Sequence, residues 1–504
     1  MEEHAAKNPV SFFFRELNTR RLAAAILFLG IFAMAVRAPA DTDTWWHLQA
    51  GRVTLEQGQI LQTDLFSHTR YGSPWVNHSW FSQVILYWLF DQFAYAGLSL
   101  WIGLVVAAAF GFVYLQMEGN VFIRAFILIL AAATSAVIWS ARPQLLSFLL
   151  TAVVAYVLYL LKWRGVNRLW LLPPLFVLWV NLHAGYALGF MVLAAFVAGE
   201  VLNHLLEPLV PADDPVVGWR GIAWIISIAL LSVMLLVINP NTARMWTYYL
   251  ETVRIDVLQD VIQEWSSPDF HPLHTQPFIW LLLATLGTAG LSNRRIDGTD
   301  LALVSGFAYA GLLAGRNLGP FALVAAPVLS RHVTAIGSEL WRIRPRVRRS
   351  VPPAQAALNW TLLVLVVTLA AVKISQPIRP SFNERLQQES LPVGAAAWIE
   401  KQQPEGKMFN HYNWGGYLIW RLWPDYRVFV DGRTDLYGND FLRRYLEAQL
   451  ARPGFEEILE QYDVNLVLMP SESTLSTQLA CQGGWRETYR DEVATIWVRE
   501  ESEE

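Results

Sequence analysis

Long apolar stretches separated by short polar turns run through the first three quarters of the chain. A helix that crosses a membrane needs about 20 mostly apolar residues, and candidate stretches recur along the sequence. Eleven of them lie at residues 22–36, 95–117, 124–140, 144–161, 168–182, 185–206, 221–238, 277–291, 300–315, 317–330 and 356–374. Several are short for a full crossing, which indicates helices buried among their neighbours. The pattern predicts a mainly α, polytopic membrane protein with about eleven transmembrane helices.

Basic residues are concentrated before the first apolar stretch and in the even-numbered turns between the stretches. They are Arg15, Arg20, Arg21, Lys162, Arg164, Arg168, Arg294, Arg295, Arg331, Arg342, Arg344, Arg346, Arg348 and Arg349. Because cytoplasmic loops carry an excess of Lys and Arg, this predicts a cytoplasmic N-terminus and an extracytoplasmic C-terminal tail. The small residues at 38–40 also fit a signal-peptide cleavage site. Under either interpretation the chain after residue 36 lies outside the cytoplasm.

Three extracytoplasmic pieces follow from this topology. They are a first outside loop at 37–94, a second outside loop at 239–276, and the tail. The chain is therefore expected to have two domains, a membrane domain at 1–374 and the tail at 375–504. Within the tail, the apolar pattern predicts strands at 426–430, 465–469 and 492–498, and helices at 440–450 and 455–462. The tail is therefore expected to be a small α/β domain.

Composition agrees with a membrane protein and excludes several classes. Hydrophobic residues make up 54% of the 504 residues and charged residues only 16%, where a soluble domain carries about 25%. The tail has 13 basic and 21 acidic residues, so it offers no basic face for a nucleic acid. Cys481 is the only cysteine, which excludes an intramolecular disulfide and a cysteine-based metal cluster. The sequence contains neither a P-loop nor an H-E-x-x-H motif.

The first outside loop carries the densest set of polar and aromatic residues. Asp41 and Asp43 lie just beyond the first apolar stretch, and Trp45, Trp46 and His47 follow them. A carboxylate at the apolar boundary can have a raised pKa or hold a cation, as a general base or a metal site requires. Alternatively, Asp43 is the N-cap of an amphipathic helix at 45–57, and the tryptophans form an interfacial belt.

Here the sequence resembles the GT-C superfamily of membrane glycosyltransferases that use polyprenyl-phosphate sugars. The likeness is to bacterial members, with an architecture similar to oligosaccharyltransferases and O-mannosyltransferases. The pattern reads roughly D-x-W-W-H-L-x-x-G, then D-x-F-S-x-T, then W-x-x-H-x-W. The corresponding residues are Asp43-Thr44-Trp45-Trp46-His47-Leu48 with Gly51, Asp64-Leu65-Phe66-Ser67-His68-Thr69, and Trp75 with His78 and Trp80.

The resemblance implies an inverting transfer of a sugar from a polyprenyl-phosphate donor to an extracytoplasmic acceptor hydroxyl. Asp43 would be the catalytic base, with Asp41 as the next candidate. Arg142 and Arg316, at outside ends of apolar stretches, could clamp the donor phosphate, although snorkelling alone would also place arginines there. The residues expected at the sugar or the acceptor are Trp45, His47, Asp64, His78 and Glu264.

Further features leave alternatives open. Asp41, Asp43 and Glu264 could bind Mg²⁺ or Mn²⁺, although many relatives work without a metal. Glu264 could equally lie at an exposed helix end, and His183 is expected to be structural. In the tail, 410–418 and 430–437 distantly resemble the acceptor motif of oligosaccharyltransferase, but without its aspartate. A packed strand pair with an ion pair between Asp431 and Arg433 explains them as well.

The expected enzyme is thus a hexosyl or pentosyl transferase of the plasma membrane, working on the cell envelope. Its partners would be the bilayer, the lipid-linked sugar, and a glycan, lipid or protein acceptor. One alternative is a transporter or flippase of lipid-linked sugars, but such proteins place charges near the bilayer midplane and often show repeated halves. The other is a non-catalytic membrane scaffold with the acidic tail as its interaction module.

Overall fold

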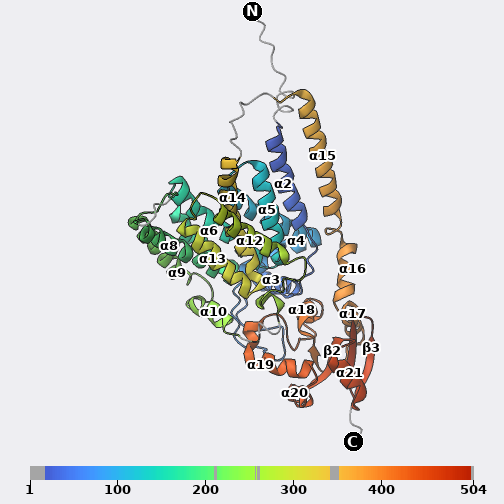
Figure 1. Cartoon of the computed structure of the whole chain (residues 1–504). Helices are drawn as coiled ribbons and strands as arrows, with labels where there is room; N and C mark the ends of the chain where they lie inside the picture. The colour runs from blue at the N-terminus through green and yellow to red at the C-terminus, as the bar shows by residue number, and fades with distance from the viewer. Residues whose placement is uncertain (1–16, 209–212, 256, 258–261, 341–350, 501–504) are drawn as a thin grey trace, which may run out of the picture.

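The structure is a computed structural model that describes residues 17–208, 213–255, 257, 262–340 and 351–500. All eleven predicted apolar stretches form helices (Figure 1). These are α2 (Thr19–Ala35), α4 (Trp80–Gln116), α5 (Val121–Ser135), α6 (Gln144–Arg164), α7 (Leu172–Leu182), α8 (Ala187–Leu206), α9 (Trp219–Leu235), α12 (Gln276–Leu291), α13 (Gly298–Leu313), α14 (Leu318–Leu340) and α15 (Pro353–Ser375). Among the described residues, six helices are long and apolar enough to cross a membrane, and four shorter apolar ones accompany them. The chain is a polytopic α-helical membrane protein.

The helices of the membrane domain differ in how they meet their surroundings. Only 11% of the apolar window of α15 is buried in the protein, which is typical of a helix that faces lipid. Inside the bundle, Lys162 bonds Glu200 at 2.5 Å and Asp297 at 2.7 Å, with all three side chains at most 1% exposed. Arg331 pairs similarly with Asp300. Because unpaired charges are costly in this environment, such pairs fix how the helices pack.

Short helices connect the longer ones. The α-helices among them are α3 (Thr44–Gln57) and α10 (Arg244–Val253), and the 3₁₀ helices are η1 (Ala136–Ile138), η2 (Leu169–Leu171), η3 (Ala184–Tyr186), η4 (Gln263–Trp265) and η5 (Gly315–Asn317). Helix α3 packs closely on α4, and a Cβ added at Gly51 would lie 2.2 Å from the backbone oxygen of Gln83. Only glycine permits this approach, which explains the glycine of the first sequence pattern.

The tail is a small α/β domain. Its elements are α16 (Pro380–Ser390), α17 (Val393–Gln402), β1 (Lys407–Asn410), η6 (Tyr412–Trp414), α18 (Gly415–Leu422), α19 (Thr434–Gln449), α20 (Phe455–Gln461), β2 (Val464–Pro470), α21 (Thr474–Cys481), β3 (Trp485–Arg490) and β4 (Ala494–Arg499). The strand order is β1-β2-β4-β3, with β1 and β2 parallel and the other pairs antiparallel.

Two of the three predicted tail strands are confirmed as β2 and β4, and one prediction is wrong. Residues 426–430 form no strand, although they are apolar and Val428 and Val430 are buried. Val428 makes only an isolated bridge with Ser67 of the first loop, because the segment packs against that loop rather than joining the sheet. Burial, and not strand pairing, accounts for its apolar pattern.

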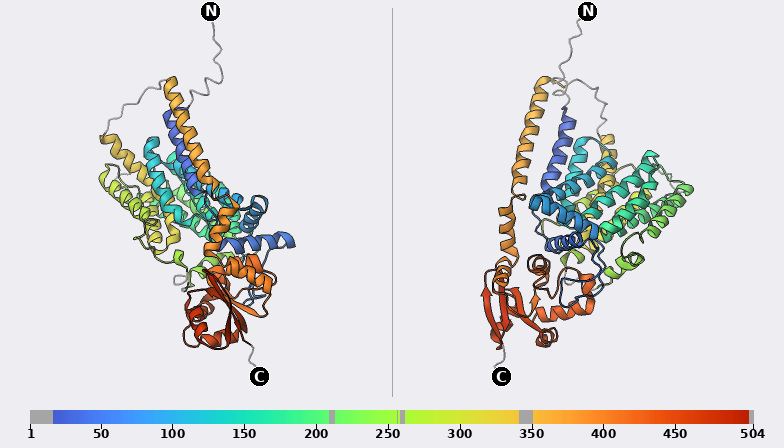
Figure 2. Two further views of the ribbon diagram at one scale, coloured as in Figure 1. Left: turned by 90° about the vertical axis from the view of Figure 1, so that its right-hand side faces the viewer. Right: turned by 180° about the vertical axis from the view of Figure 1, so that it is seen from behind.

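The tail lies against the first outside loop, at the end of the bundle away from the starts of α2 and α15 (Figures 1 and 2). Val428 exchanges backbone hydrogen bonds with Phe66 and His68, both at 3.0 Å. Helix α18 packs on α3. The arginines at 342–349, on which the predicted topology partly depends, lie outside the described residues. The contacts make the first loop a layer between the helices and the tail.

Candidate active site

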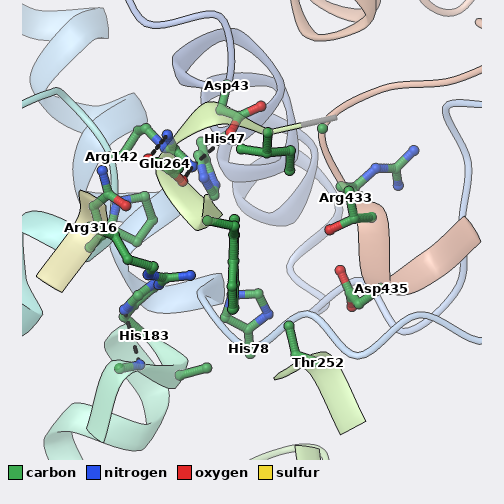
Figure 3. Close-up of a pocket in the computed structure, with 18 of the residues that line it drawn as sticks. Asp43, His47, His78, Arg142, His183, Thr252, Glu264, Arg316, Arg433 and Asp435 are labelled. Atoms are coloured by element: carbon green, nitrogen blue, oxygen red, sulfur yellow. Dashed lines mark hydrogen bonds and ion pairs between the residues drawn. The ribbon is translucent and has the colours of Figure 1, made fainter. Parts of the chain in front are cut away.

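A cavity of about 120 Å³ lies where the two outside loops, the ends of several spans and the tail meet (Figure 3). Helix termini and loops supply its polar wall, so the residues come from distant parts of the sequence. Its lining includes Asp43, Trp46, His47, Trp75, His78, Arg142, His183, Tyr248, Thr252, Glu264, Trp265, Arg316, Gly432, Arg433, Thr434 and Asp435. Six of the residues named from the sequence lie in this lining: Asp43, His47, His78, Arg142, Glu264 and Arg316.

Three carboxylates converge on the guanidinium of Arg142. Its Nη2 atom lies 2.8 Å from Asp43 Oδ2 and 3.3 Å from Glu264 Oε1, and its Nη1 atom lies 3.2 Å from Asp41 Oδ2. Burial opposes ionisation of Glu264, but Arg142 and Arg316 outweigh it and lower the pKa of Glu264. Burial also opposes the charge of Arg142, and the three carboxylates overcome it and hold the pKa of Arg142 well above its usual value.

Asp43 differs from the other two carboxylates. It occupies the N-cap position of α3 but makes no side-chain cap hydrogen bond, so the helix-cap interpretation is wrong. Its Oδ1 accepts a hydrogen bond from Trp46 Nε1 at 3.1 Å. Burial raises the pKa of Asp43 to about 6, with help from the negative charges of Asp41 and Glu264 and against the effect of Arg142. Asp43 thus changes its charge close to neutral pH.

Arg316 has a different environment from Arg142. Its guanidinium stacks over the ring of Trp265, with Cζ 4.2 Å from the ring centroid. Among the described residues no acceptor binds this guanidinium, so its donors are available to a ligand. Arg316 and Glu264 also line a neighbouring cavity of about 390 Å³, bordered by η1 and the segment 266–275. Arg316 therefore lies on the boundary between the two cavities.

His78 and His183 also line the cavity. His78 Nδ1 lies 2.7 Å from the hydroxyl of Tyr248, and His183 Nδ1 lies 2.8 Å from that of Ser147. Burial and nearby cations lower the pKa of both histidines. Asp435, at the start of α19, faces Tyr248 and His78, and burial raises its pKa. No spacing or motif in the sequence indicated Tyr248, whereas Asp435 lies in the segment 430–437 that distantly resembles an acceptor motif. Only the fold brings the two side chains together.

Comparisons place this architecture among known folds. No family model matches the sequence, and no curated protein matches it. Among solved structures, the oligosaccharyltransferase of Archaeoglobus fulgidus in the apo form matches with a TM-score of 0.56 and 11% identity, over 90% of this chain and 70% of that chain. A structure of the same archaeal protein in complex with zinc and sulfate matches with a TM-score of 0.51 and 11% identity, over 89% and 68%.

ArnT from Cupriavidus metallidurans in the apo state matches with a TM-score of 0.50 and 12% identity, over 98% of both chains. Both proteins are GT-C glycosyltransferases. The chain has the GT-C fold. The resemblance found in the sequence of the first loop is therefore confirmed at the level of the fold.

Within this GT-C fold, several residues of the sequence pattern support the cavity without lining it. Asp64 is fully buried, accepts hydrogen bonds from the backbone of Phe66 and Ser67, and pairs with Arg433 at 2.7 Å. Trp45 is buried and packs on Tyr417 of the tail. Neither residue lines the cavity, so the expectation that Asp64 and Trp45 contact the sugar or the acceptor is not met. Asp41 does not line the cavity either, and its carboxylate contacts Nη1 of Arg142.

Arg433 connects the tail to Asp64 of the first loop. From the sequence alone, it was expected only as the ion-pair partner of Asp431. That ion pair is present, with Nη2 2.7 Å from Asp431 Oδ2. The guanidinium also lies over the ring of Trp75 at 4.8 Å. Because Arg433 holds one carboxylate of the tail and one of the first loop, it fixes the adjoining residues Gly432 and Thr434 in the cavity wall.

The three carboxylates proposed as metal ligands do not fit a metal ion in this arrangement. Among the described residues, no group of three or more His, Cys, Asp or Glu side chains is placed to hold one. Asp41, Asp43 and Glu264 point at the guanidinium of Arg142, which fills the space between them.

Proposed function

We propose that the protein transfers a sugar from a polyprenyl-phosphate donor to an acceptor hydroxyl at the extracytoplasmic membrane boundary, with inversion at the anomeric carbon. The observation that carries this proposal is the position of Asp43. Its carboxylate has no helix-capping bond, lines a polar cavity and has a pKa of about 6. The GT-C fold is what makes glycosyl transfer the reaction in question.

Asp43 acts as the general base in this proposal. It takes the proton of the acceptor hydroxyl as that oxygen forms a bond to the anomeric carbon. The bond from this carbon to the lipid-phosphate oxygen breaks, and its electrons leave with the phosphate. General-base catalysis is most effective when the pKa lies near the working pH, and a pKa of about 6 meets that condition.

Arg316 is the residue that we propose for the donor phosphate. Its donors are unbound by the described residues, whereas Arg142 is already occupied by three carboxylates. A guanidinium can bind two phosphate oxygens and stabilise the charge that develops on the leaving group. The cavity of about 390 Å³ beside it has apolar walls that include Val137, Ile138 and Leu318, which suit the lipid side of the donor.

The tail supplies the acceptor side of the site. Gly432, Thr434 and Asp435 line the cavity. Figure 3 shows Asp435 across the cavity from Arg142 and Arg316, so we expect an acceptor arriving from outside to meet this wall first. Their position supports a tail that takes part in catalysis rather than a separate interaction module.

The decisive experiment is Asp43→Asn, measured by sugar transfer from a lipid-linked donor and by thermal stability in detergent. We expect transfer to fall by roughly 10²–10⁴-fold, the usual contribution of a general base, while the melting temperature stays close to that of the parent. The matched control is Asp463→Asn, whose side chain is 72% exposed in the tail and lines neither cavity. A transfer rate within about threefold of the parent would exclude Asp43 as the base.

Arg316→Gln separates donor binding from the base. We expect weaker binding of the polyprenyl-phosphate donor and a lower kcat/KM, with the pH profile due to Asp43 unchanged. The control Arg421→Gln removes a partly exposed arginine that pairs with Glu400 in the tail. If Arg316→Gln binds the donor as tightly as the parent does, the phosphate role is wrong.

The topology can be tested through Cys481, which is the only cysteine of the chain and is exposed in the tail. We propose that the tail lies outside the plasma membrane. A maleimide that cannot cross membranes should then label spheroplasts that express the protein, and Cys481→Ser should abolish the labelling. Labelling only after the membrane is opened would reverse the topology and remove Asp43 from the extracytoplasmic side.

A further inference from the structure

His183 lies between the end of α7 and the start of η3, and its ring nitrogen Nδ1 has two partners inside the protein. It accepts a hydrogen bond from the backbone N–H of Gly185 at 3.0 Å. The hydroxyl of Ser147 lies 2.8 Å from the same nitrogen. Because the Ser147 oxygen accepts a hydrogen bond from Trp179 Nε1 at 2.8 Å, its own proton is available for Nδ1.

These contacts fix where the ring of His183 carries its proton. A backbone N–H can only donate, so Nδ1 presents a lone pair to Gly185 and the proton of the neutral ring is on Nε2. Burial, together with His78 and the cations Arg316 and Arg142, lowers the pKa of His183 well below its usual value, which agrees with a neutral ring. His183 is therefore a hydrogen-bond donor through Nε2 and not a base.

The glycine at position 185 is required for this arrangement. A Cβ added there would lie 2.4 Å from Ser147 Oγ and 2.8 Å from His183 Nδ1. Any side chain would push the serine and the histidine away from the backbone N–H. The close approach that holds the ring in place is thus built into the turn between α7 and α8.

The proton on Nε2 has no acceptor among the described residues, since the hydrogen bonds of this ring are those of Nδ1. His183 lines the cavity of about 120 Å³, and Figure 3 shows it on the same side as Arg316. The guanidinium of Arg316 stacks on Trp265 and also lacks an acceptor there. One charged and one neutral donor on the same side of a cavity suit a phosphate, which offers several acceptor oxygens.

We propose that His183 donates a hydrogen bond through Nε2 to a phosphate oxygen of the lipid-linked donor, beside Arg316. The inference rests on the proposed function for the nature of that lipid-linked phosphate. Negative charge grows on the phosphate as its bond to the anomeric carbon breaks, and a donor already in place stabilises this charge without a proton transfer. The fixed ring also leaves Asp43 as the base, because Nε2 has no lone pair to accept a proton.

Two substitutions separate the two nitrogens of His183. The amide of asparagine reaches only as far as Nδ1, so His183→Asn can still accept from Gly185 but loses the donor in the cavity. The amide of glutamine reaches the position of Nε2, so His183→Gln keeps a donor there and loses the acceptor for Gly185. A purely structural histidine therefore tolerates asparagine better, whereas a phosphate-binding histidine tolerates glutamine better.

The assay titrates purified full-length protein in detergent with a short-chain polyprenyl phosphate and records thermal unfolding of each variant. We expect His183→Asn to melt close to the parent and to bind this ligand roughly 10- to 100-fold more weakly, the usual effect of losing a hydrogen bond to a charged group. His183→Gln should melt at a lower temperature but bind within about threefold of the parent. The control is His204→Asn, which removes a histidine that contacts the backbone oxygen of Val217 and lines neither cavity.

Two further ligands identify what the site recognises. The corresponding polyprenol lacks the phosphate, so the parent and His183→Asn should bind it equally. Inorganic phosphate lacks the lipid and should bind the parent much more weakly than the polyprenyl phosphate does. If the parent binds both phosphates equally and His183→Asn loses both, the site serves a free anion and the assignment to the lipid-linked donor is wrong.

The ring can also be observed directly by ¹⁵N NMR of the parent, with His183→Gln used to assign its signals. We expect a protonated Nε2 and an unprotonated Nδ1, and addition of the polyprenyl phosphate should shift the Nε2 signal. The opposite tautomer, or no shift at saturation, would overturn the inference even if His183→Asn did not fold.

The binding results distinguish failure of this inference from failure of the proposed function. Binding by folded His183→Asn that equals binding by the parent would show that the histidine is only structural, while a loss in Arg316→Gln would leave the proposed donor site standing. Conversely, a parent that binds polyprenyl phosphate through His183 but transfers no sugar would refute the proposed function and retain the inference.

Discussion

Removing the buried cation that connects the tail to the first loop should unfold this junction at a lower temperature. In Arg433→Met the thioether keeps most of the apolar stem between Phe66 and Trp75, but the charge is lost. Asp64 and Asp431, each 2.7 Å from the guanidinium and with fully buried side chains, then face each other without a counter-ion. The substitution therefore isolates the electrostatic part of the contact.

The expected magnitude follows from that burial. Breaking a buried ion pair by removing one partner costs about 3–5 kcal/mol, because the remaining charge stays desolvated. For a cooperative unit of roughly 150–250 residues this lowers Tm by about 2–4 °C per kcal/mol, so about 6–20 °C in total. Arg421→Met is the control: its pair with Glu400 has side chains 32% and 39% exposed, and such pairs contribute at most about 1 kcal/mol.

The assay is thermal unfolding in detergent at one scan rate for both variants, repeated across pH. Burial raises the pKa of Asp64, but Arg433 and two hydrogen bonds overcome this and lower it. Asp64 therefore stabilises the native state fully above its unfolded pKa of about 4, and this stabilisation is lost as pH falls through the lower folded pKa. The difference between parent and Arg433→Met should shrink in that acidic range. Equal melting temperatures for Arg433→Met and Arg421→Met at neutral pH would refute the reasoning.

Four further predictions concern the bundle, the cavity wall, and the pH dependence of activity and of stability. Lys162→Met leaves two buried carboxylates unpaired, so the protein should lose about 3–5 kcal/mol of stability; an unchanged Tm would contradict this. Gly432→Ala would place a Cβ 1.9 Å from Asp43 Oδ1, so transfer should fall by about 10²-fold, whereas Gly483→Ala, in open space, should match the parent. Because burial raises the pKa of Asp43 to about 6, kcat/KM should fall as pH drops below about 6, and a flat profile there would contradict the base role. The same raised pKa means that Asp43 binds its proton more tightly in the folded state, so its contribution to stability should decrease as pH rises from about 4 to about 6.

The local patterns of the sequence predicted the elements well wherever a single segment decides its own structure. All eleven apolar stretches are helices, because a segment of that length and composition satisfies its backbone hydrogen bonds internally. The helix after Asp43 was expected at 45–57 and is found at Thr44–Gln57. By contrast, 426–430 was expected to be a strand but only packs on the first loop. Its apolar residues indicate that the segment is buried, but they do not indicate which part of the protein it packs against.

The sequence by itself determined the helices and pointed to six residues that line the cavity, because the helices follow from hydropathy and the residues from the motif in the first loop, the ends of apolar stretches and the family resemblance. Only the tertiary structure decided what each residue does there. It brought Glu264 to Arg142, gave Arg142 three carboxylates and left Arg316 without an acceptor among the described residues. In the fold, Asp435 and Tyr248 line the cavity, whereas Asp64 and Trp45 are buried and do not line it. The reason is that side-chain charges act over a few ångströms, so their roles depend on contacts between loops far apart in the chain, which no local pattern encodes.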